Sequence, residues 1–274
     1  MFITIIYAKN ESNLFLNTVM ISRLLFFLMI LTSLFSCKNK SSKTCSACNK
    51  DNLELLDSLE KLENQKKTDL KKNSETKVSN LVDIESFNSK IRVDLKYAST
   101  DNFMKMKLYN RLKKAFLQKD IAERLVKCQV YLNKLNPDFH LLVYDAVRPL
   151  SVQQKMWDAL DTIPPLERTK FVSNPINGSI HNYGAAVDLT ICDSNGIPLD
   201  MGAGYDDIRQ IAYPRLEQQF LDSGELKSEQ VENRKLLRKV MASQRFSNIT
   251  TEWWHFNACT KKEAKEKYII LEKE

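Results

Sequence analysis

Residues 179–191 read SIHNYGAAVDLTI, and the fold of the domain depends on how this stretch is built. Its second half is apolar and contains β-branched residues, which predicts a buried strand. His181 precedes Asp188 by seven residues, a spacing that would place both on one face of a helix, but Gly184 and the β-branched residues argue against a helix. We therefore expect His181 on a loop, which Gly184 turns into a strand that carries Asp188.

The segments around this stretch mix strands and helices without a regular βαβ rhythm. Residues 91–99 alternate apolar and polar side chains like a strand, and residues 140–147 predict a buried strand that Arg148-Pro149 ends. Helical spacing predicts three helices, at 115–135, at 151–160 with Ser151 as N-cap, and at 227–243. This order predicts an α+β fold whose largely antiparallel sheet is flanked by helices.

Composition and charge narrow the class of protein. The chain has 274 residues, of which 43% are hydrophobic and 27% charged, as in a globular protein. A wholly disordered, collagen-like or many-spanning membrane chain is therefore excluded. The net charge of +7 comes from 41 basic and 34 acidic residues and is not concentrated in one part, so we expect no nucleic-acid partner. We expect one folded domain over residues 81–274.

The N-terminal region carries a targeting signal. Residues 20–37, MISRLLFFLMILTSLFSC, have a basic residue, a short apolar run and a polar end, the layout of a bacterial secretory signal. The apolar run is shorter than the roughly 20 residues of a transmembrane helix. The ending from Leu34 to Cys37 resembles a lipoprotein box, in which the cysteine is lipidated. We expect residues 1–36 to be an export signal region with Met20 as the start; a plain signal anchor or a buried apolar helix is the alternative.

These features predict an exported bacterial lipoprotein, membrane-anchored and facing the periplasm or the cell exterior. Residues 37–80 are polar and rich in Ser and Lys, and we expect a lipidated flexible tether there. Cys45 and Cys48 form a C-x-x-C pair without a second pair nearby for a zinc knuckle, so a local disulfide and unpaired thiols both fit. The later cysteines are expected to be small buried residues: Cys128, Cys192 and Cys259.

The chain has only three histidines, so each position can be argued separately. With His181 and Asp188, His255 in TEWWHFN would supply two imidazoles and one carboxylate. That is the ligand set of a catalytic zinc site whose fourth position is left for water. Glu252, three residues before His255, would be placed to take a proton from that water and pass it to a leaving amine. His140 has no such partners in the sequence, and we expect an ordinary packed or surface residue.

Two of these segments also match a known family. SIHNYGAAVD and EWWH together resemble the S-x-H-x-x-G-x-A-x-D and E-x-W-H signatures of the zinc D-alanyl-D-alanine dipeptidases, the VanX-like metallopeptidases. Three further segments resemble parts of the same family: DLKYASTDNF at 94–103, YDAVRP at 144–149 and MGAGYDD at 201–207. The resemblance extends over residues 82–258, with one departure at Val147, where the family usually has an aromatic residue.

The resemblance implies a role for each matching position. His181, Asp188 and His255 would bind one zinc ion per chain. Glu252 would be the general base and then the general acid. Arg148 would stabilise the oxyanion of the tetrahedral intermediate.

The resemblance also implies how the two ends of a small substrate are recognised. Asp206 would bind the free amino group of a dipeptide with help from Tyr97, and Ser179 would lie near the substrate carboxylate. Because a dipeptide is a zwitterion, a site that recognises it needs an anion for its ammonium group and donors for its carboxylate.

The expected function is therefore zinc-dependent hydrolysis of D-alanyl-D-alanine to two D-alanines in peptidoglycan metabolism. A D,D- or L,D-carboxypeptidase that trims peptidoglycan stem peptides could use the same metal site. Segments 94–103 and 201–207 favour the dipeptidase, because they would close the amino end of the site. A non-catalytic cell-wall-binding lipoprotein is a third interpretation, and Glu252 argues against it because a binder has no use for a general base. The expected partners are the dipeptide and, through the lipid, the membrane.

Overall fold

The structure is a computed structural model of the chain and describes residues 57–62, 64–65 and 80–274. The export signal, the lipidated cysteine and the C-x-x-C pair predicted from the sequence all lie outside these residues. Within the described ranges, no helix combines the length and the apolar character needed to cross a membrane.

The described residues belong to two compact units. Residues 57–62 and 64–65 belong to the first unit, where they are helical and exposed, and Lys61 pairs with Asp57 at 3.0 Å. All other described residues belong to the second unit, which contains both β-sheets.

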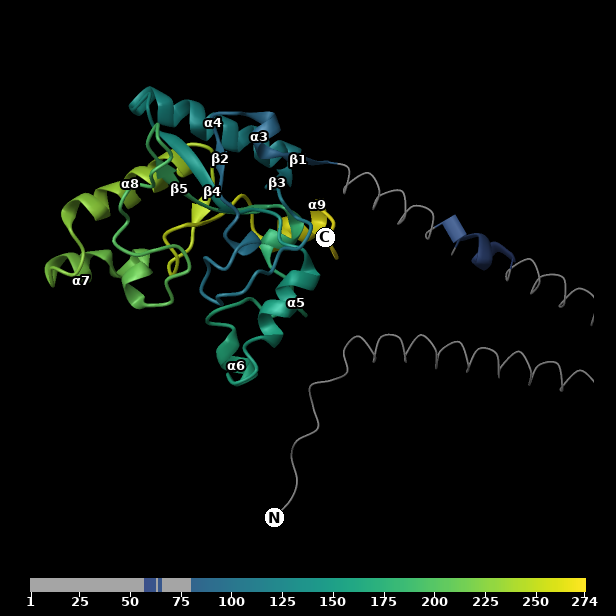
Figure 1. Ribbon diagram of the computed structural model, residues 1–274. Coiled ribbons are helices and arrows are strands. Elements are labelled where there is room, and N and C mark those ends of the chain that lie inside the picture. The colour runs from purple at the N-terminus through teal and green to yellow at the C-terminus, as the bar shows by residue number, and fades with distance from the viewer. Residues whose placement is uncertain (1–56, 63, 66–79) are drawn as a thin grey trace, which may run out of the picture. The chain divides into compact units, whose positions relative to one another are not determined.

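The second unit contains short strands and helices of very different length (Figure 1). The strands are β1 (Leu81–Asp83), β2 (Arg92–Val93), β3 (Phe116–Gln118), β4 (His140–Asp145), β5 (Ala186–Cys192), β6 (Ser247–Asn248) and β7 (His255–Asn257). The α-helices are α3 (Ile84–Phe87), α4 (Lys119–Leu135), α5 (Leu150–Asp158), α6 (Pro165–Arg168), α7 (Glu217–Asp222), α8 (Ser228–Ala242) and α9 (Lys261–Lys267). Four 3-10 turns are η2 (Lys96–Ala98), η3 (Ile180–Tyr183), η4 (Gln210–Ala212) and η5 (Pro214–Leu216).

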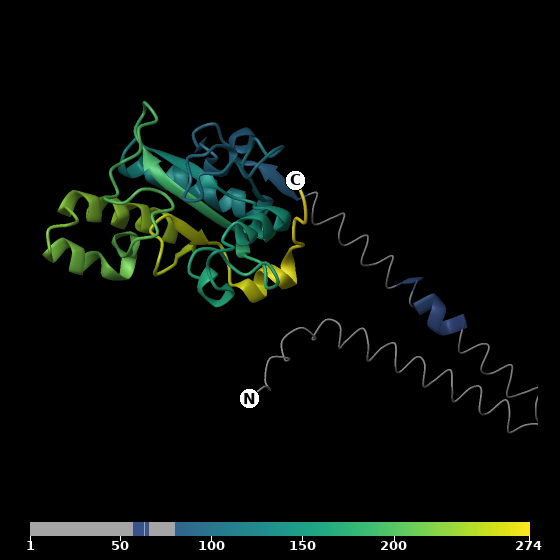
Figure 2. The ribbon, with the colours of Figure 1, turned by 60° about the horizontal axis from the view of Figure 1, so that its bottom comes forward.

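The main sheet has five strands in the order β2-β4-β5-β7-β6, and only β2 and β4 pair in parallel. A separate antiparallel pair joins β1 to β3. Helix α4 packs against β4 and α8, while α7 and α8 run side by side in both views (Figures 1 and 2). The structure thus confirms the predicted α+β class with a largely antiparallel sheet.

The two central strands hold the core. Every residue of β5 is buried, and in β4 only His140 at the start is not. Successive side chains of a strand point to opposite faces of the sheet, so Leu189 lies on the face opposite to Asp188 and Thr190. A strand covered on both faces shows a continuous apolar run, which is why residues 185–191 were recognisable from the sequence.

Three local predictions were wrong, two of them because a tertiary contact overrides the local pattern. The helix expected from residue 115 begins at Lys119, because Phe116–Gln118 pair with β1 instead. The strand expected over 91–99 is only two residues long and gives way to the turn η2.

Ser151 is not the N-cap of α5. The helix begins at Leu150, after Pro149. Its first free N–H groups, those of Leu150 and Ser151, donate to the backbone carbonyls of Leu271 and Glu272 at 2.8 and 2.9 Å. A distant segment therefore caps this helix end, so no side-chain cap is needed.

The cysteines of the described region agree in part with expectation. Cys128 and Cys192 are fully buried and free, whereas Cys259 is only half-buried. His140 lies at the start of β4, where its Nδ1 faces the carbonyl of Lys90 at 2.9 Å.

Candidate active site

The centre of the site is one row of residues across the sheet. Asp188 on β5 lies opposite His255 on β7 and opposite Asp145 on β4. On β4 the register shifts between Val143 and Asp145, which marks a β-bulge. Because of this bulge, Asp145 instead of Tyr144 lies opposite Asp188. Strand pairing thus brings together three titratable residues that are far apart in the sequence.

His181 reaches this row from the turn η3, just before β5. Ser179 caps the turn, and its Oγ accepts a hydrogen bond from the N–H of His181 at 3.2 Å. Gly184 ends the turn with φ of +63°, and a Cβ added there would lie 2.8 Å from a methyl group of Leu81. The sequence predicted that the chain turns at Gly184 from the loop with His181 into the strand with Asp188, and this is confirmed.

Asn182 locks this turn to the segment that carries Arg148. Its side-chain amide is fully buried, donates to the carbonyl of Arg148 at 2.7 Å and accepts from the N–H of Ser179 at 2.5 Å. Its own carbonyl accepts from the N–H of Leu271 at 2.9 Å. The two loops that bear His181 and Arg148 are therefore tied together by one buried amide.

Three side chains form a group suited to a metal ion. The ligand atoms of His181, Asp188 and His255 all lie within 4.8 Å of one another. Nε2 of His181 is 3.2 Å and Nδ1 of His255 is 2.9 Å from Oδ1 of Asp188. Two imidazoles and one carboxylate match the donor set of catalytic zinc sites, so the residues present fit such an ion.

The second ring nitrogen of each histidine has a hydrogen-bond partner outside the three-residue group. Nδ1 of His181 lies 2.7 Å from the carbonyl of Ala146, which can only accept, so this nitrogen carries the proton and Nε2 is left with a lone pair. Nε2 of His255 lies 2.9 Å from Oδ1 of Asn257. These partners fix both rings with a nitrogen pointing at Asp188, as metal-ligating histidines require.

The charges of this group favour ionised Asp188. Burial raises the pKa of Asp188, but the two imidazoles outweigh burial and hold that pKa well below its usual range. Burial lowers the pKa of His255, yet the hydrogen bond and the charge of Asp188 raise it to about 9. The carboxylate is thus available as a metal ligand, and it accepts a hydrogen bond from Nδ1 of His255.

Arg148 lies beside the group and is 8% exposed. Its guanidinium donates from Nε and Nη2 to one carboxylate oxygen of Asp145, at 3.0 and 2.7 Å, and from Nη1 to Gln153. It also stacks over the ring of Tyr97, 4.9 Å from the ring centre. Nη2 is 3.6 Å from Oδ2 of Asp188, so the positive charge is fixed next to the carboxylate of the three-residue group.

Glu252 lies at the edge of the group rather than in it. Its Oε2 is 3.9 Å from Nδ1 of His255, and its side chain is 34% exposed. Burial and the charge of Asp188 raise the pKa of Glu252, while His255 lowers it. Glu252 also lines a cleft together with Asp206 and Trp254, so it connects that cleft to the three-residue group. A carboxylate with a raised pKa next to a metal position suits proton transfer.

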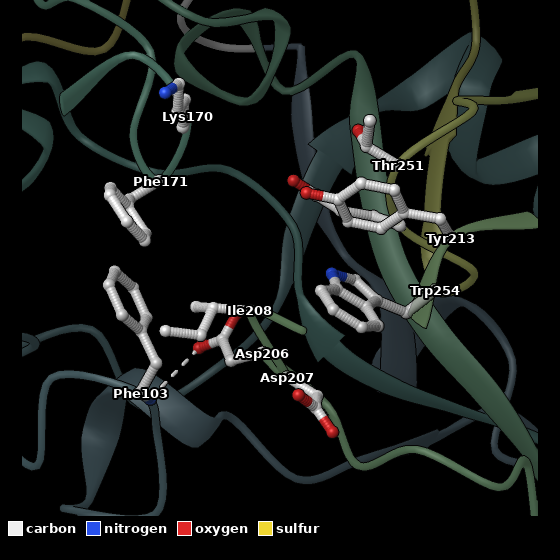
Figure 3. A pocket seen from close by; sticks show the side chains of 10 residues that line it. Phe103, Lys170, Phe171, Asp206, Asp207, Ile208, Tyr213, Thr251 and Trp254 are labelled. Atoms are coloured by element: carbon white, nitrogen blue, oxygen red, sulfur yellow. Dashed lines mark hydrogen bonds between the residues drawn. The ribbon is translucent and has the colours of Figure 1, made fainter. Parts of the chain in front are cut away.

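Asp206 and Tyr97 lie together at the cleft. The hydroxyl of Tyr97 donates to Oδ1 of Asp206 at 3.2 Å. The N–H of Phe103 faces Oδ2 of Asp206 at 3.5 Å, the contact drawn as a dashed line in Figure 3. Burial raises the pKa of Asp206 well above its usual range, and the carboxylate of Asp188 adds to this. Ser179 is buried, and its hydroxyl oxygen is engaged as the cap of η3, as described above.

Three residues of the site were missed from the sequence. Asp145 holds Arg148 and accepts from the hydroxyl of Tyr109 at 2.5 Å. Tyr205 donates to Oδ2 of Asp188 at 3.2 Å and packs edge-on against Trp254. Asn257 orients His255. The available signals were their positions inside segments already singled out, since Asp145 is in YDAVRP and Tyr205 is in MGAGYDD.

Comparisons with known proteins agree with this geometry. The family model described as D-ala-D-ala dipeptidase matches residues 77–273. The D-alanyl-D-alanine dipeptidase of Escherichia coli is 32% identical over 176 residues, covering 64% of this chain and 83% of the relative. The enzyme of that name from Synechocystis is 29% identical over 168 residues, covering 52% of this chain and 68% of the relative.

Similarity to solved structures is weaker. The LdcB LD-carboxypeptidase aligns with a TM-score of 0.38 and 19% identity, over 69% of this chain and 72% of that chain. A structural similarity of this size carries no argument, so the family assignment rests on the sequence matches.

The Asp145–Arg148 pair predicts coupled stability effects. Asp145→Ala is expected to lower the free energy of unfolding by about 3–5 kcal/mol, because it leaves the Arg148 guanidinium buried without its counter-charge. Combining Asp145→Ala with Arg148→Met should cost less than the sum of the two single changes, since neither charge is then left unpaired. Urea denaturation followed by circular dichroism measures these values.

Asp138→Ala, which removes an exposed carboxylate, is the control and should change the free energy of unfolding by no more than about 0.5 kcal/mol. Strict additivity of the two changes at Asp145 and Arg148 would contradict the coupling.

Proposed function

The chain belongs to the D-ala-D-ala dipeptidase family of peptidases, and from that premise we propose that it hydrolyses D-alanyl-D-alanine to two D-alanines with the aid of one zinc ion. The observation that carries the proposal is the cleft that has Glu252 beside the three-residue group and the half-buried Asp206 in the same lining. A half-buried carboxylate at that position suits a free ammonium group, such as the amino end of a dipeptide.

Asp206 is proposed to bind the amino end of the substrate. Its carboxylate is held by the Tyr97 hydroxyl and the Phe103 N–H, so its position is fixed before a substrate arrives. An incoming ammonium group would supply the positive charge that stabilises ionised Asp206 and would lower its raised pKa. The substrate is thereby oriented with its peptide bond near Glu252.

His181, Asp188 and His255 would hold the zinc ion. When bound, zinc polarises the scissile carbonyl and lowers the pKa of a water molecule. Glu252 is placed to accept a proton from the attacking water and then to donate it to the leaving amine. Its raised pKa suits both halves of this transfer, since an acid of ordinary pKa would give up the proton too early.

Arg148 is proposed to stabilise the negative charge that develops on the carbonyl oxygen. Asp145 and Gln153 hold its guanidinium in place, so little reorganisation is needed as the charge develops. Tyr205 and Trp254 pack together beside Asp188, where they limit the access of bulk water and strengthen these electrostatic interactions.

The substrate is tested directly on the purified full-length chain. D-Ala-D-Ala, L-Ala-L-Ala and a muropeptide pentapeptide are incubated separately, and amine release is followed. We expect D-Ala-D-Ala to be cleaved with the highest kcat/KM. Faster release from the pentapeptide would instead identify a carboxypeptidase, and no release from any of the three would overturn the proposal.

Metal dependence gives a second test. His181→Ala and His255→Ala should each lose bound zinc and activity, because two remaining ligands hold zinc poorly. His140→Ala is the matched control and should keep both, since His140 faces the carbonyl of Lys90. Metal content by mass spectrometry checks this, and full activity of protein without bound transition metal would refute the zinc assignment.

Variants of Glu252 and Arg148 should lose activity without losing bound zinc. Glu252→Ala is expected to keep its zinc while losing about 10²–10⁴-fold in kcat, because the proton transfer is lost. Arg148→Ala should also keep zinc and lose on the order of 10²–10³-fold in kcat, since it removes a group that acts mainly in the transition state.

Steady-state kinetics at a temperature where both variants remain folded measures these effects. An increase in KM alone for Arg148→Ala would make this residue a ground-state clamp for the carboxylate. Loss of zinc in Glu252→Ala would make Glu252 a ligand.

We also propose that the chain is an exported lipoprotein, with the lipid on Cys37. The sequence from Leu34 to Cys37 supports this. Cys37→Ser should abolish fatty-acid labelling and move the protein out of the membrane fraction, while Cys45→Ser should leave both unchanged. Labelling that survives Cys37→Ser would disprove the assignment.

A further inference from the structure

We propose that Phe103 and Phe171 form an aromatic wall that limits the size of the substrate residue whose ammonium group Asp206 binds. This inference rests on the proposed function and names a determinant of its substrate class. Both side chains line the cleft that also contains Asp206 and Glu252. In Figure 3 the two rings point toward each other on one side of the cleft, and Trp254 and Tyr213 lie on the other side.

The aromatic wall is adjacent to Asp206, the carboxylate that would bind the ammonium group of the substrate. The backbone N–H of Phe103 faces Oδ2 of Asp206 at 3.5 Å, and Ile208, two residues after Asp206, also lines the cleft. An ammonium group and a side chain of an amino acid are bonded to the same carbon. We therefore place the side chain of a residue bound through its ammonium at Asp206 next to Phe103, which lines the same cleft.

The loop that carries Phe103 is rigidly held by its neighbour. Asn102 is 4% exposed, and its side-chain amide satisfies five backbone groups. It donates to three carbonyls and accepts from two N–H groups, at Lys96, Ser99, Met104 and Met106. Moving Phe103 outward would break buried hydrogen bonds, each of which costs about 1–3 kcal/mol when its partner is left unsatisfied.

The segment that carries Phe171 is held in a similar way. The N–H of Phe171 donates to the carbonyl of Arg168 at 2.9 Å. The Arg168 guanidinium in turn donates to the carbonyls of Ile163 and Trp157, at 2.7 and 3.1 Å, and lies over the Trp157 ring. A wall fixed from both sides excludes a larger side chain rather than adapting to it. Under this proposal a methyl side chain is accepted, and a branched or aromatic one is selected against.

The test compares D-Ala-D-Ala with D-Leu-D-Ala on the full-length chain. Phe103→Ala and Phe171→Ala should each raise the ratio of kcat/KM for D-Leu-D-Ala to that for D-Ala-D-Ala by about tenfold or more, the scale on which hydrophobic pockets discriminate size. Phe87→Ala is the matched control, because Phe87 is 40% exposed and does not line the cleft, and it should leave the ratio unchanged. Ratios within about twofold of wild type in folded Phe103→Ala and Phe171→Ala would overturn the inference.

A binding measurement separates this inference from the proposed reaction. In the Glu252→Ala background, calorimetry gives the dissociation constants of both dipeptides with and without Phe103→Ala, and with Phe171→Ala should the first variant not fold. A selective gain in D-Leu-D-Ala binding supports the wall even if the wild-type chain hydrolyses neither dipeptide, in which case only the proposed reaction fails. Absence of binding of either dipeptide to every variant would overturn both.

Discussion

The site depends on the register of β5 between β4 and β7. Asp188 lies opposite His255 on one side and Asp145 on the other, and the second pairing exists only because a bulge shifts β4 by one position. Slipping a strand by one residue turns its side chains to the other face of the sheet. Such a slip at β5 would remove Asp188 from the site and leave an unpaired carboxylate in the core on the opposite face.

The row of Asp145, Asp188 and His255 across the sheet explains why several charged groups can be buried together. Asp145 neutralises Arg148, and Asp188 faces both imidazoles, so each buried charge has a partner of opposite sign within hydrogen-bond distance. Buried charges are tolerated only under such pairing. Asp206 differs, because its hydrogen bonds among the described residues come from a neutral hydroxyl and a backbone N–H, and burial raises its pKa without a cation among those hydrogen-bond partners. This difference fits a carboxylate whose cationic partner arrives with a ligand.

Sequence reasoning succeeded where local pattern and final structure coincide. The apolar run around Asp188 became the buried strand β5, and Gly184, at φ of +63°, ends the turn after His181 as expected. It failed where a distant segment intervened. Phe116–Gln118 have a helical sequence pattern but pair with β1 as a strand. The N-terminus of α5 is capped by the carbonyls of Leu271 and Glu272 and not by the side chain of Ser151. Such contacts join residues many positions apart, so no local window of sequence contains them.

The sequence by itself determined which chemical groups are present: His181, Asp188 and His255 as a zinc-type donor set, Glu252 as a nearby carboxylate, and membership of a peptidase family. Residue types and short spacings carry this information, because it depends on which atoms are available. Only the tertiary structure decided which groups hold that chemistry in place. Asp145 on Arg148, Asn257 on His255, Tyr205 on Asp188 and the aromatic wall beside Asp206 all depend on strand register, a bulge and loop packing, which arise when the whole chain folds.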